Sequence, residues 1–174
     1  MVSTSQGARP EDARKDGQIR GRSRWFVHNA GWVMARGRMG QVTAALIWID
    51  ERILIAQRGR GKRFACQWEF PGGKVRPDES PEECLRREIK EELNLEIRVD
   101  RHFCTVHHRY PDFDIELITF WCSIMAGELR LMEHEQVRWI SLAEASQYDF
   151  VEADLKVIAA LAPPPGEGKR DCKG

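Results

Sequence analysis

The sequence lacks a long apolar run, which argues against a membrane-spanning helix. No stretch of its 174 residues approaches the roughly 20 consecutive apolar residues that such a helix needs. It also lacks an excess of one charge, because 27 Lys and Arg stand against 27 Asp and Glu. A neutral chain offers no overall attraction to nucleic acid or to an anionic membrane, so stable binding to either is not expected. Any anionic ligand must be recognised by local groups.

Paired cysteines are lacking as well. The five cysteines stand singly, without a C-x-x-C motif, at Cys66, Cys84, Cys104, Cys122 and Cys172. An odd, dispersed set is typical of reduced thiols in a cytosolic protein, so we expect a cytoplasmic location. Apolar residues make up 42% of the chain, which is enough for a core that needs neither disulfides nor oligomerisation. The sequence leaves both a monomer and a homodimer open.

The two ends of the chain differ in composition from its middle. Residues 1–40 carry eight Lys or Arg against three acids and no apolar core of a secretory signal, which predicts a basic, disordered leader. The alternatives are an organelle transit peptide, which the acids disfavour, and a translation start at Met34 or Met39. Residues 163–174 begin with three prolines and predict a disordered tail. Residues 41–162 are left for one folded domain.

Apolar and β-branched runs predict a sheet in this domain. Residues 42–49 form a mostly apolar run that suits a strand covered on both faces. Further strands are expected over residues 52–58, 68–70, 95–109, 113–125 and 136–140. A short helix is expected after Ser141 and a final one from Asp154 to Leu161. Strands with helices between and after them predict an α/β fold, with a sheet sandwiched between helices.

The clearest helix is predicted over residues 81–93. Ser80 stands at the N-cap, Pro81 at the first helical position, and Glu83 completes a capping box. Asn94 follows at the point where a left-handed residue closes a helix. The local sequence therefore fixes both ends of this helix.

Three carboxylates lie along one side of the same helix. Glu88, Glu91 and Glu92 are spaced i, i+3 and i+4, which makes them neighbours. At about 100° per residue, Glu88 and Glu92 border the buried stripe that Leu85 and Ile89 define. Acids so placed are partly desolvated and repel one another, so a cation among them is favoured. With oxygen ligands and no His or Cys cluster, Mg²⁺ or Mn²⁺ is expected rather than zinc.

Taken alone, this pattern also fits surface glutamates that pair with neighbouring basic side chains. The surrounding residues favour the metal site, because they match the spacing G-x5-E-x7-R-E-U-x-E-E-x-G-U, where U is bulky and apolar. The matching residues are Gly73, Glu79, Arg87, Glu88, Ile89, Glu91, Glu92 and Leu95. In this respect the chain resembles the Nudix hydrolases. Asn94 replaces the last glycine of the pattern, a departure at a helix cap rather than at a ligand.

The resemblance covers residues 41–162, and residues 68–74 are similar to the MutT-type branch of that family. It implies the Nudix fold, an α/β/α sandwich with a central mixed sheet. It also implies metal-dependent hydrolysis of oxidised or modified nucleoside triphosphates, such as 8-oxo-dGTP or cytidine analogues, to monophosphate and pyrophosphate. The alternatives are an ADP-ribose or dinucleotide pyrophosphatase and a non-catalytic Nudix-like domain that binds nucleotides or nucleic acid. The latter commonly lack some of the carboxylates, whereas this chain has all of them.

By the resemblance, Glu88 and Glu92 bind the metal and Glu91 joins them. Glu79 supports the site directly or through water. Arg87 orients these carboxylates with its planar fork and does not contact the substrate.

Glycines and two cations complete the expected phosphate end. Glycine lets the backbone approach a metal or a phosphate closely, so Gly72 is expected at the metal and Gly73 at the phosphate. Arg58 and Lys74 are placed as phosphate contacts in the MutT-type branch, although ordinary surface cations fit these positions equally.

The general base is assigned to Glu88 or Glu133. The resemblance expects a further acid before a late strand, and Glu133 stands at that point. A general base must lie within hydrogen-bonding distance of the attacking water. The alternative for Glu133 is therefore a solvated loop acid that does not reach this water.

Recognition of the nucleobase is expected at Phe70, as an apolar wall, and at Asp154. An ionised Asp accepts a hydrogen bond from the exocyclic amine of cytosine. A protonated Asp donates as well as accepts, which suits an oxidised guanine. Asp154 is alternatively a helix N-terminal acid that the helix dipole favours. Phe113 stands where the original MutT pattern has a basic residue, so guanine contacts of that kind are not expected.

Overall fold

The structure is a computed structural model that describes residues 26–28, 31–33 and 39–161. Most of the expected leader and the whole expected tail lie outside these ranges, as does Met34. Within the leader, the backbone forms a short antiparallel hairpin of β1 (Phe26–His28) and β2 (Gly31–Val33). The division into leader, domain and tail therefore stays a prediction.

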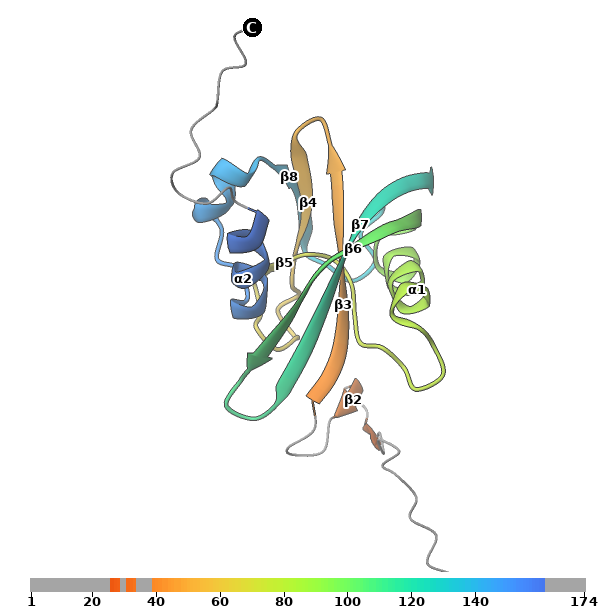
Figure 1. The fold of residues 1–174 in the computed structure, drawn as a ribbon, viewed down its shortest axis with the longest axis vertical. Coiled ribbons are helices and arrows are strands. Elements are labelled where there is room, and N and C mark those ends of the chain that lie inside the picture. The colour runs from red at the N-terminus through yellow and green to blue at the C-terminus, as the bar shows by residue number, and fades with distance from the viewer. Residues whose placement is uncertain (1–25, 29–30, 34–38, 162–174) are drawn as a thin grey trace, which may run out of the picture.

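A six-stranded sheet forms the centre of the molecule (Figure 1). Its strands are β3 (Met39–Ile49), β4 (Arg52–Gln57), β5 (Trp68–Glu69), β6 (Leu95–Arg109), β7 (Asp114–Gly127) and β8 (Gln136–Ile140). The strand order is β5-β4-β3-β7-β6, with β8 paired to β4. β3 runs parallel to β7 and antiparallel to β4, and the remaining pairs are antiparallel, so the sheet is mixed as predicted.

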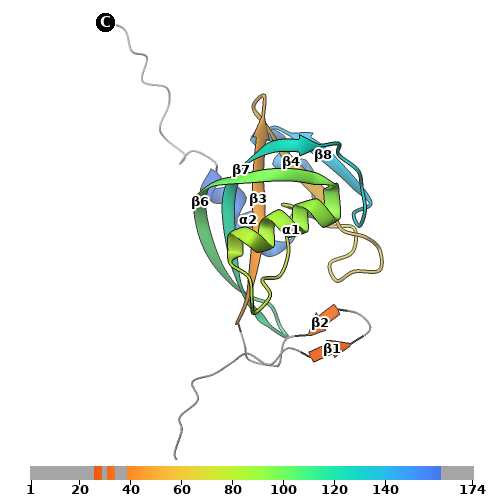
Figure 2. The same ribbon diagram turned by 90° about the vertical axis from the view of Figure 1, so that its right-hand side faces the viewer.

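Helices cover both faces of this sheet. They are α1 (Pro81–Leu93), the 3-10 helix η1 (Leu142–Gln147) and α2 (Glu152–Leu161). Figure 1 shows α1 and α2 on opposite sides of β3, and Figure 2 shows α1 lying across the front of the sheet. Leu85 and Ile89 of α1 are fully buried in one core cluster, whereas Ala153 and Val157 of α2 are buried in the other. The predicted α/β/α sandwich is therefore confirmed.

The two ends of α1 form as their sequence predicts. Ser80 Oγ accepts from the backbone N–H of Glu83 at 3.2 Å, and the Glu83 carboxylate accepts from the backbone N–H of Ser80 at 2.8 Å. Asn94 adopts the left-handed conformation with φ 57° and donates its backbone N–H to Lys90. These caps fix the rotation of α1, and with it the face that carries the carboxylates.

Several predicted boundaries are wrong by one to three residues, and two of them have a clear cause. β3 begins at Met39 rather than at residue 42, because Met39 and Gly40 continue the parallel ladder with β7. α2 begins at Glu152 rather than at Asp154. The chain before it runs inward, with Phe150 and Val151 buried, so Asp154 enters the core in the first turn of α2.

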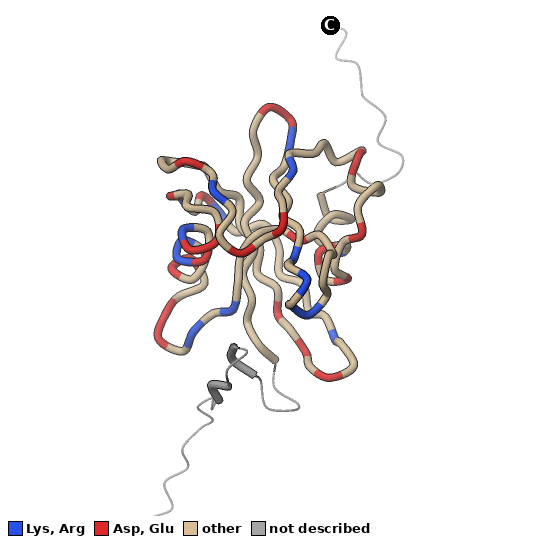
Figure 3. The backbone as a smooth tube through the Cα atoms, turned by 180° about the vertical axis from the view of Figure 1, so that it is seen from behind, with Lys and Arg blue, Asp and Glu red and all other residues tan. Residues whose placement is uncertain are grey.

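The surface and the thiols agree with the composition. Figure 3 shows Lys and Arg interspersed with Asp and Glu over the described part of the chain, rather than separated into two faces. Among the described residues no helix is long and apolar enough to cross a membrane. The four described cysteines, all except Cys172, are free thiols, as expected.

The centre of the sheet supplies much of the stability of the fold. Leu54 of β4 is fully buried in the cluster beneath α1, so Leu54→Ala should lower the free energy of unfolding by about 3 kcal/mol. Leu155 of α2 is 50% exposed, and Leu155→Ala should change it by less than about 0.5 kcal/mol. Urea unfolding followed by circular dichroism measures both values. Similar losses in the two variants would contradict this description of the core.

Candidate active site

One cavity of about 690 Å³ gathers most of the residues expected at the site. It is lined by Arg58, Phe70, Gly72, Gly73, Lys74, Glu88, Glu91, Glu92, Glu133 and Asp154. Arg87 contacts the carboxylates at its edge, and Glu79 contacts Arg87. Segments that are far apart in sequence therefore meet around a single space.

Arg87 connects three carboxylates. Its guanidinium donates to Glu79 at 2.9 and 2.5 Å, to Glu88 at 2.6 Å and to Glu91 at 3.2 Å. Hydrogen bonding from Arg87 is the main reason that the pKa of Glu79 falls to about 2. Arg87 points away from the cavity into this network, an arrangement that favours an orienting role over substrate contact.

Glu92 is the most deeply buried carboxylate of α1. It is 6% exposed, and its Oε2 is buried without a hydrogen-bond partner. Burial, followed by repulsion from Glu69 and Glu88, raises its pKa to about 8. Burial also raises the pKa of Glu88, although Arg87 partly offsets this effect. Two adjacent carboxyl groups therefore face the cavity with their ionised forms disfavoured.

The glycine segment lies against β3 and beside Glu88. Thr43 donates its backbone N–H to Gly73 O at 2.8 Å, which holds the segment like an additional strand. A Cβ on Gly72 would come within 2.1 Å of Thr43 O, and Gly72 has φ 156°. A Cβ on Gly73 would come within 2.3 Å of Glu88 Cδ. Gly72 therefore requires glycine, because backbone atoms block a side chain there, whereas a side chain on Gly73 would displace the Glu88 carboxylate.

Glu133 also lines the cavity, in a loop next to the C-terminal end of α1. Its loop is attached to the helix end through a 3.0 Å hydrogen bond from Met132 N to Glu92 O. The Glu133 side chain is 49% exposed and forms an ion pair with Lys62. That contact is the main cause of its lowered pKa, so Glu133 is held as a carboxylate next to the cavity.

The two expected phosphate contacts lie on the same wall. Arg58 forms an ion pair with Glu69 and donates to Arg63 O at 2.7 Å. The pKa of Lys74 is lowered, first by burial and then by the positive charges of Arg58 and Arg63. This wall carries an excess of positive charge, which an anionic ligand would relieve.

Phe70 and Asp154 also line the cavity. The Phe70 backbone N–H donates to Asp154 Oδ1 at 3.0 Å. Asp154 is buried, and burial raises its pKa to about 8. An acid that only caps a helix would be solvated, so its burial in the cavity lining favours a ligand-binding role.

The sequence reasoning missed Glu69 and His134. Glu69 accepts from Arg58 and lies 3.2 Å from Nε2 of His134, whose side chain is 2% exposed. Repulsion from Glu69 also raises the pKa of Glu92. The available signals were a charged residue between two apolar aromatic ones at position 69, and a histidine directly after Glu133.

The carboxylates beside the cavity offer oxygen donors to a divalent cation. In the described ranges, no three His, Cys, Asp or Glu side chains converge as a ready-made metal site. The unpartnered Oε2 of Glu92 nevertheless points to a missing ligand, and Glu88 and the glycine backbone lie beside it. These donors are all oxygens, which fits a hard cation such as Mg²⁺ or Mn²⁺.

Comparison with known proteins identifies the family. The chain belongs to the NUDIX domain family, whose model matches residues 39–161, and it is therefore a Nudix hydrolase. It is 37% identical over 124 residues to the CTP pyrophosphohydrolase of Escherichia coli, covering 71% of this chain and 92% of that protein. It is 31% identical over 112 residues to the 8-oxo-dGTP diphosphatase of Escherichia coli, covering 64% and 87%.

Solved structures agree with this assignment. The solution structure of the Escherichia coli ORF135 protein matches with a TM-score of 0.63 and 35% identity, covering 75% of this chain and 96% of that one. The MutT Nudix hydrolase of Burkholderia pseudomallei matches with a TM-score of 0.63 and 28% identity, covering 72% and 99%. The chain thus spans nearly the whole length of these relatives.

Glu92 should cost stability in the metal-free protein while supporting activity. The pKa of Glu92, about 8, exceeds the ordinary value of 4.5. The contribution of this carboxyl group to the free energy of unfolding is therefore fully present below pH 4.5 and is lost as the pH rises through 8. The free energy of unfolding of Glu92→Gln, relative to that of wild type, should therefore increase by about 2 kcal/mol as the pH rises from 5.5 to 8.5. Urea unfolding with chelator present measures this difference. The kcat of Glu92→Gln should fall about 100-fold or more.

Glu82→Gln, in the first turn of the same helix, is the matched control. Its free energy of unfolding should stay within about 0.5 kcal/mol of the wild-type value at pH 5.5 and at pH 8.5, and its activity should be unchanged. Equal stability of Glu92→Gln and wild type at pH 8.5, or near-normal turnover, would remove Glu92 from the metal site.

Proposed function

We propose that this chain hydrolyses nucleoside triphosphates to nucleoside monophosphate and pyrophosphate with Mg²⁺ or Mn²⁺. Oxidised or otherwise modified nucleotides are its substrates, and it clears them from the cytoplasmic nucleotide pool. The observation that carries the proposal is the single cavity described above. It is lined by half-buried carboxylates, a basic wall and the Phe70–Asp154 pair.

The polyphosphate would lie between the basic wall and α1. Arg58 and Lys74 face the same cavity as Glu88 and Glu92, so the phosphate chain is within reach of both. Gly73 lets the backbone come close to a phosphate oxygen, because no side chain separates them. Arg87 keeps Glu88 in place through its 2.6 Å contact and remains outside the substrate space.

Glu88 and Glu92 would hold the cation, with Glu91 and the Gly72 backbone beside them and Glu79 fixed by Arg87. When bound, the cation neutralises phosphate charge, polarises a phosphoryl oxygen and lowers the pKa of the attacking water. Glu88 and Glu133 both border the cavity and are the two candidates for the base that accepts the water proton. As the new P–O bond forms, the anhydride P–O bond breaks and its electron pair leaves on the departing product, which is pyrophosphate when the α-phosphorus is attacked and the nucleoside monophosphate when the β-phosphorus is attacked.

The base of the nucleotide would pack on Phe70 and bind Asp154. Because the pKa of Asp154 is raised to about 8, its carboxyl group is mostly protonated at pH 7 and offers one donor and one acceptor. Two relatives support this substrate class, since one is named for CTP and the other for 8-oxo-dGTP.

A substrate panel tests the proposal directly. Purified protein with Mg²⁺ is given CTP, dCTP, dGTP, 8-oxo-dGTP, methylated nucleotides and ADP-ribose, and products are separated by chromatography. We expect pyrophosphate and a monophosphate from one or more modified triphosphates, at kcat/KM at least about tenfold above dGTP. Faster cleavage of ADP-ribose than of any triphosphate would contradict the proposal and favour the dinucleotide-type activity.

Asp154 should make base preference depend on pH. As the pH rises through about 8, Asp154 loses its proton and becomes an acceptor only, which favours the cytosine amine over oxidised guanine. The ratio of kcat/KM for CTP to that for 8-oxo-dGTP should therefore increase between pH 6.5 and 9. Asp154→Asn keeps one donor and one acceptor at every pH, so its ratio should stay flat. Parallel profiles for the two proteins would remove Asp154 from base recognition.

A further inference from the structure

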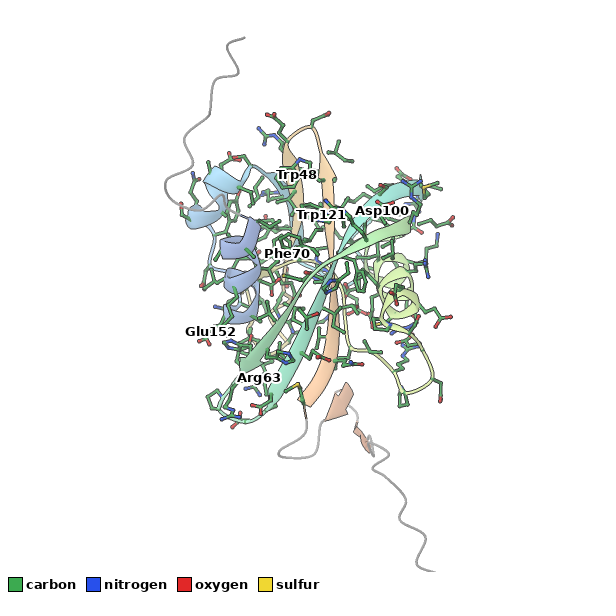
Figure 4. The ribbon with its side chains drawn as sticks, in the orientation of Figure 1. Trp48, Arg63, Phe70, Asp100, Trp121 and Glu152 are labelled. Carbon is green, nitrogen blue, oxygen red and sulfur yellow. The ribbon has the colours of Figure 1, made fainter. Side chains whose placement is uncertain are left out.

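The loop of residues 59–66 forms part of the cavity wall, although it carries none of the residues assigned above. Lys62, Arg63 and Phe64 from this loop line the cavity, opposite Asp112 and Phe113 of the turn between β6 and β7. Figure 4 labels Arg63 next to that turn. The two segments are about fifty residues apart in the chain, and Arg63 and Phe64 contact the turn through their side chains.

Arg63 makes this connection in two ways. Its Nη2 donates to Asp112 Oδ2 at 3.1 Å, and its guanidinium carbon lies 4.4 Å from the centre of the Phe113 ring. A planar guanidinium can do both at once, whereas a lysine ammonium has no flat face to stack. Phe64 adds a third contact, with its ring centre 4.8 Å from that of Tyr110.

The backbone of the loop is held at its base by Gln57 and Arg58, which donate to Cys66 O and Arg63 O at 2.8 and 2.7 Å, and its tip contacts the turn through Arg63 and Phe64. Phe64 and Cys66 both adopt left-handed conformations, with φ 58° and 64°. Neither is a glycine, and a bulky residue in this region is held there only by its surroundings. Without the contacts to the turn, the loop would gain backbone freedom by moving away from the cavity.

We propose that Arg63 is a positioning residue that fastens the loop of residues 59–66 over the cavity, and that this contact sets substrate affinity. The statement about affinity rests on the proposed function, whereas the fastening does not. Closure places Lys62, beside Arg63 in the loop, at Glu133, and it completes the wall along the bound nucleotide. An open loop would leave that wall incomplete, so apparent affinity falls with the closed fraction.

Charge alone is the competing explanation, because Arg63 would also attract an anionic substrate. The chain offers a matched control in Arg60, a cation of the same loop whose exposed side chain takes no part in the cavity wall. Arg63→Met and Arg60→Met each remove one positive charge from the loop. Arg63→Lys keeps the charge and loses the stacked plane.

The first experiment measures hydrogen exchange in the full chain without substrate. The amides of Lys62, Cys66 and Gln67 report on the loop, because each donates to a carbonyl within residues 58–64. Arg63→Met should speed their exchange about tenfold, the effect expected from losing an ion pair and a cation–π contact together. The exchange rates in Arg63→Lys should be closer to those in Arg63→Met than to those in wild type. The rates in Arg60→Met should match those in wild type.

A second variant tests the stacked ring. Phe113→Leu should speed loop exchange in the wild-type background and add little in the Arg63→Met background, because both changes break the same contact. Additive effects, wild-type exchange in Arg63→Met, or equal effects of Arg63→Met and Arg60→Met would overturn the proposed fastening.

The kinetic experiment uses the best substrate of the panel. Arg63→Met should raise KM about threefold or more and change kcat less than KM, since Arg63 contacts none of the carboxylates of α1. An unchanged KM despite faster exchange would overturn the link to affinity. If the panel shows no hydrolysis at all, the proposed function fails, and the exchange data still decide whether Arg63 holds the loop.

Discussion

The burial of acidic groups around one cavity is the constraint on which the rest of the structure depends. Glu92 has an oxygen without a partner, Glu88 is desolvated, and Asp154 is buried as well. Arg87 neutralises only the outer side of this group, through Glu79, Glu88 and Glu91. Uncompensated carboxyl groups oppose folding, so the apolar core on both faces of the sheet must supply the stability that offsets them.

The scaffold brings these groups together through β3. The glycine segment is bonded to β3 on one side, β7 runs parallel to it on the other, and α1 packs on its face. Glu88 consequently meets Gly73 so closely that a side chain at that position would displace the Glu88 carboxylate. A site that needs oxygen ligands within a few tenths of an ångström is thereby built on packed helix and strand, with loops supplying the remaining walls.

Several charged residues outside α1 lie close together beside the cavity. Glu69 contacts Arg58 and His134 and repels Glu92, while Lys62 contacts Glu133 next to His134. A ligand that draws Arg58 or Lys62 toward its phosphates would therefore alter the surroundings of Glu69 and Glu133 as well. The basic wall and the carboxylate end are thus coupled electrostatically, and the loop of residues 59–66 carries part of that coupling.

Local sequence was sufficient for α1, because a capping box at Ser80, a left-handed Asn94 and the spacing of Glu88 and Glu92 act within a few residues of chain. It also gave the strands and the mixed sandwich, since periodicity reports which side of an element is buried. The contacts of Glu69 with His134 and of Arg63 with Asp112 join residues about fifty or more positions apart, and the local sequence does not show that these residues meet. The same holds for the burial of Asp154, which depends on how α2 packs against the sheet. The sequence by itself determined which groups carry charge and which helix displays them, whereas tertiary packing decided which of them lose solvent, and desolvation sets their pKa values and their chemistry.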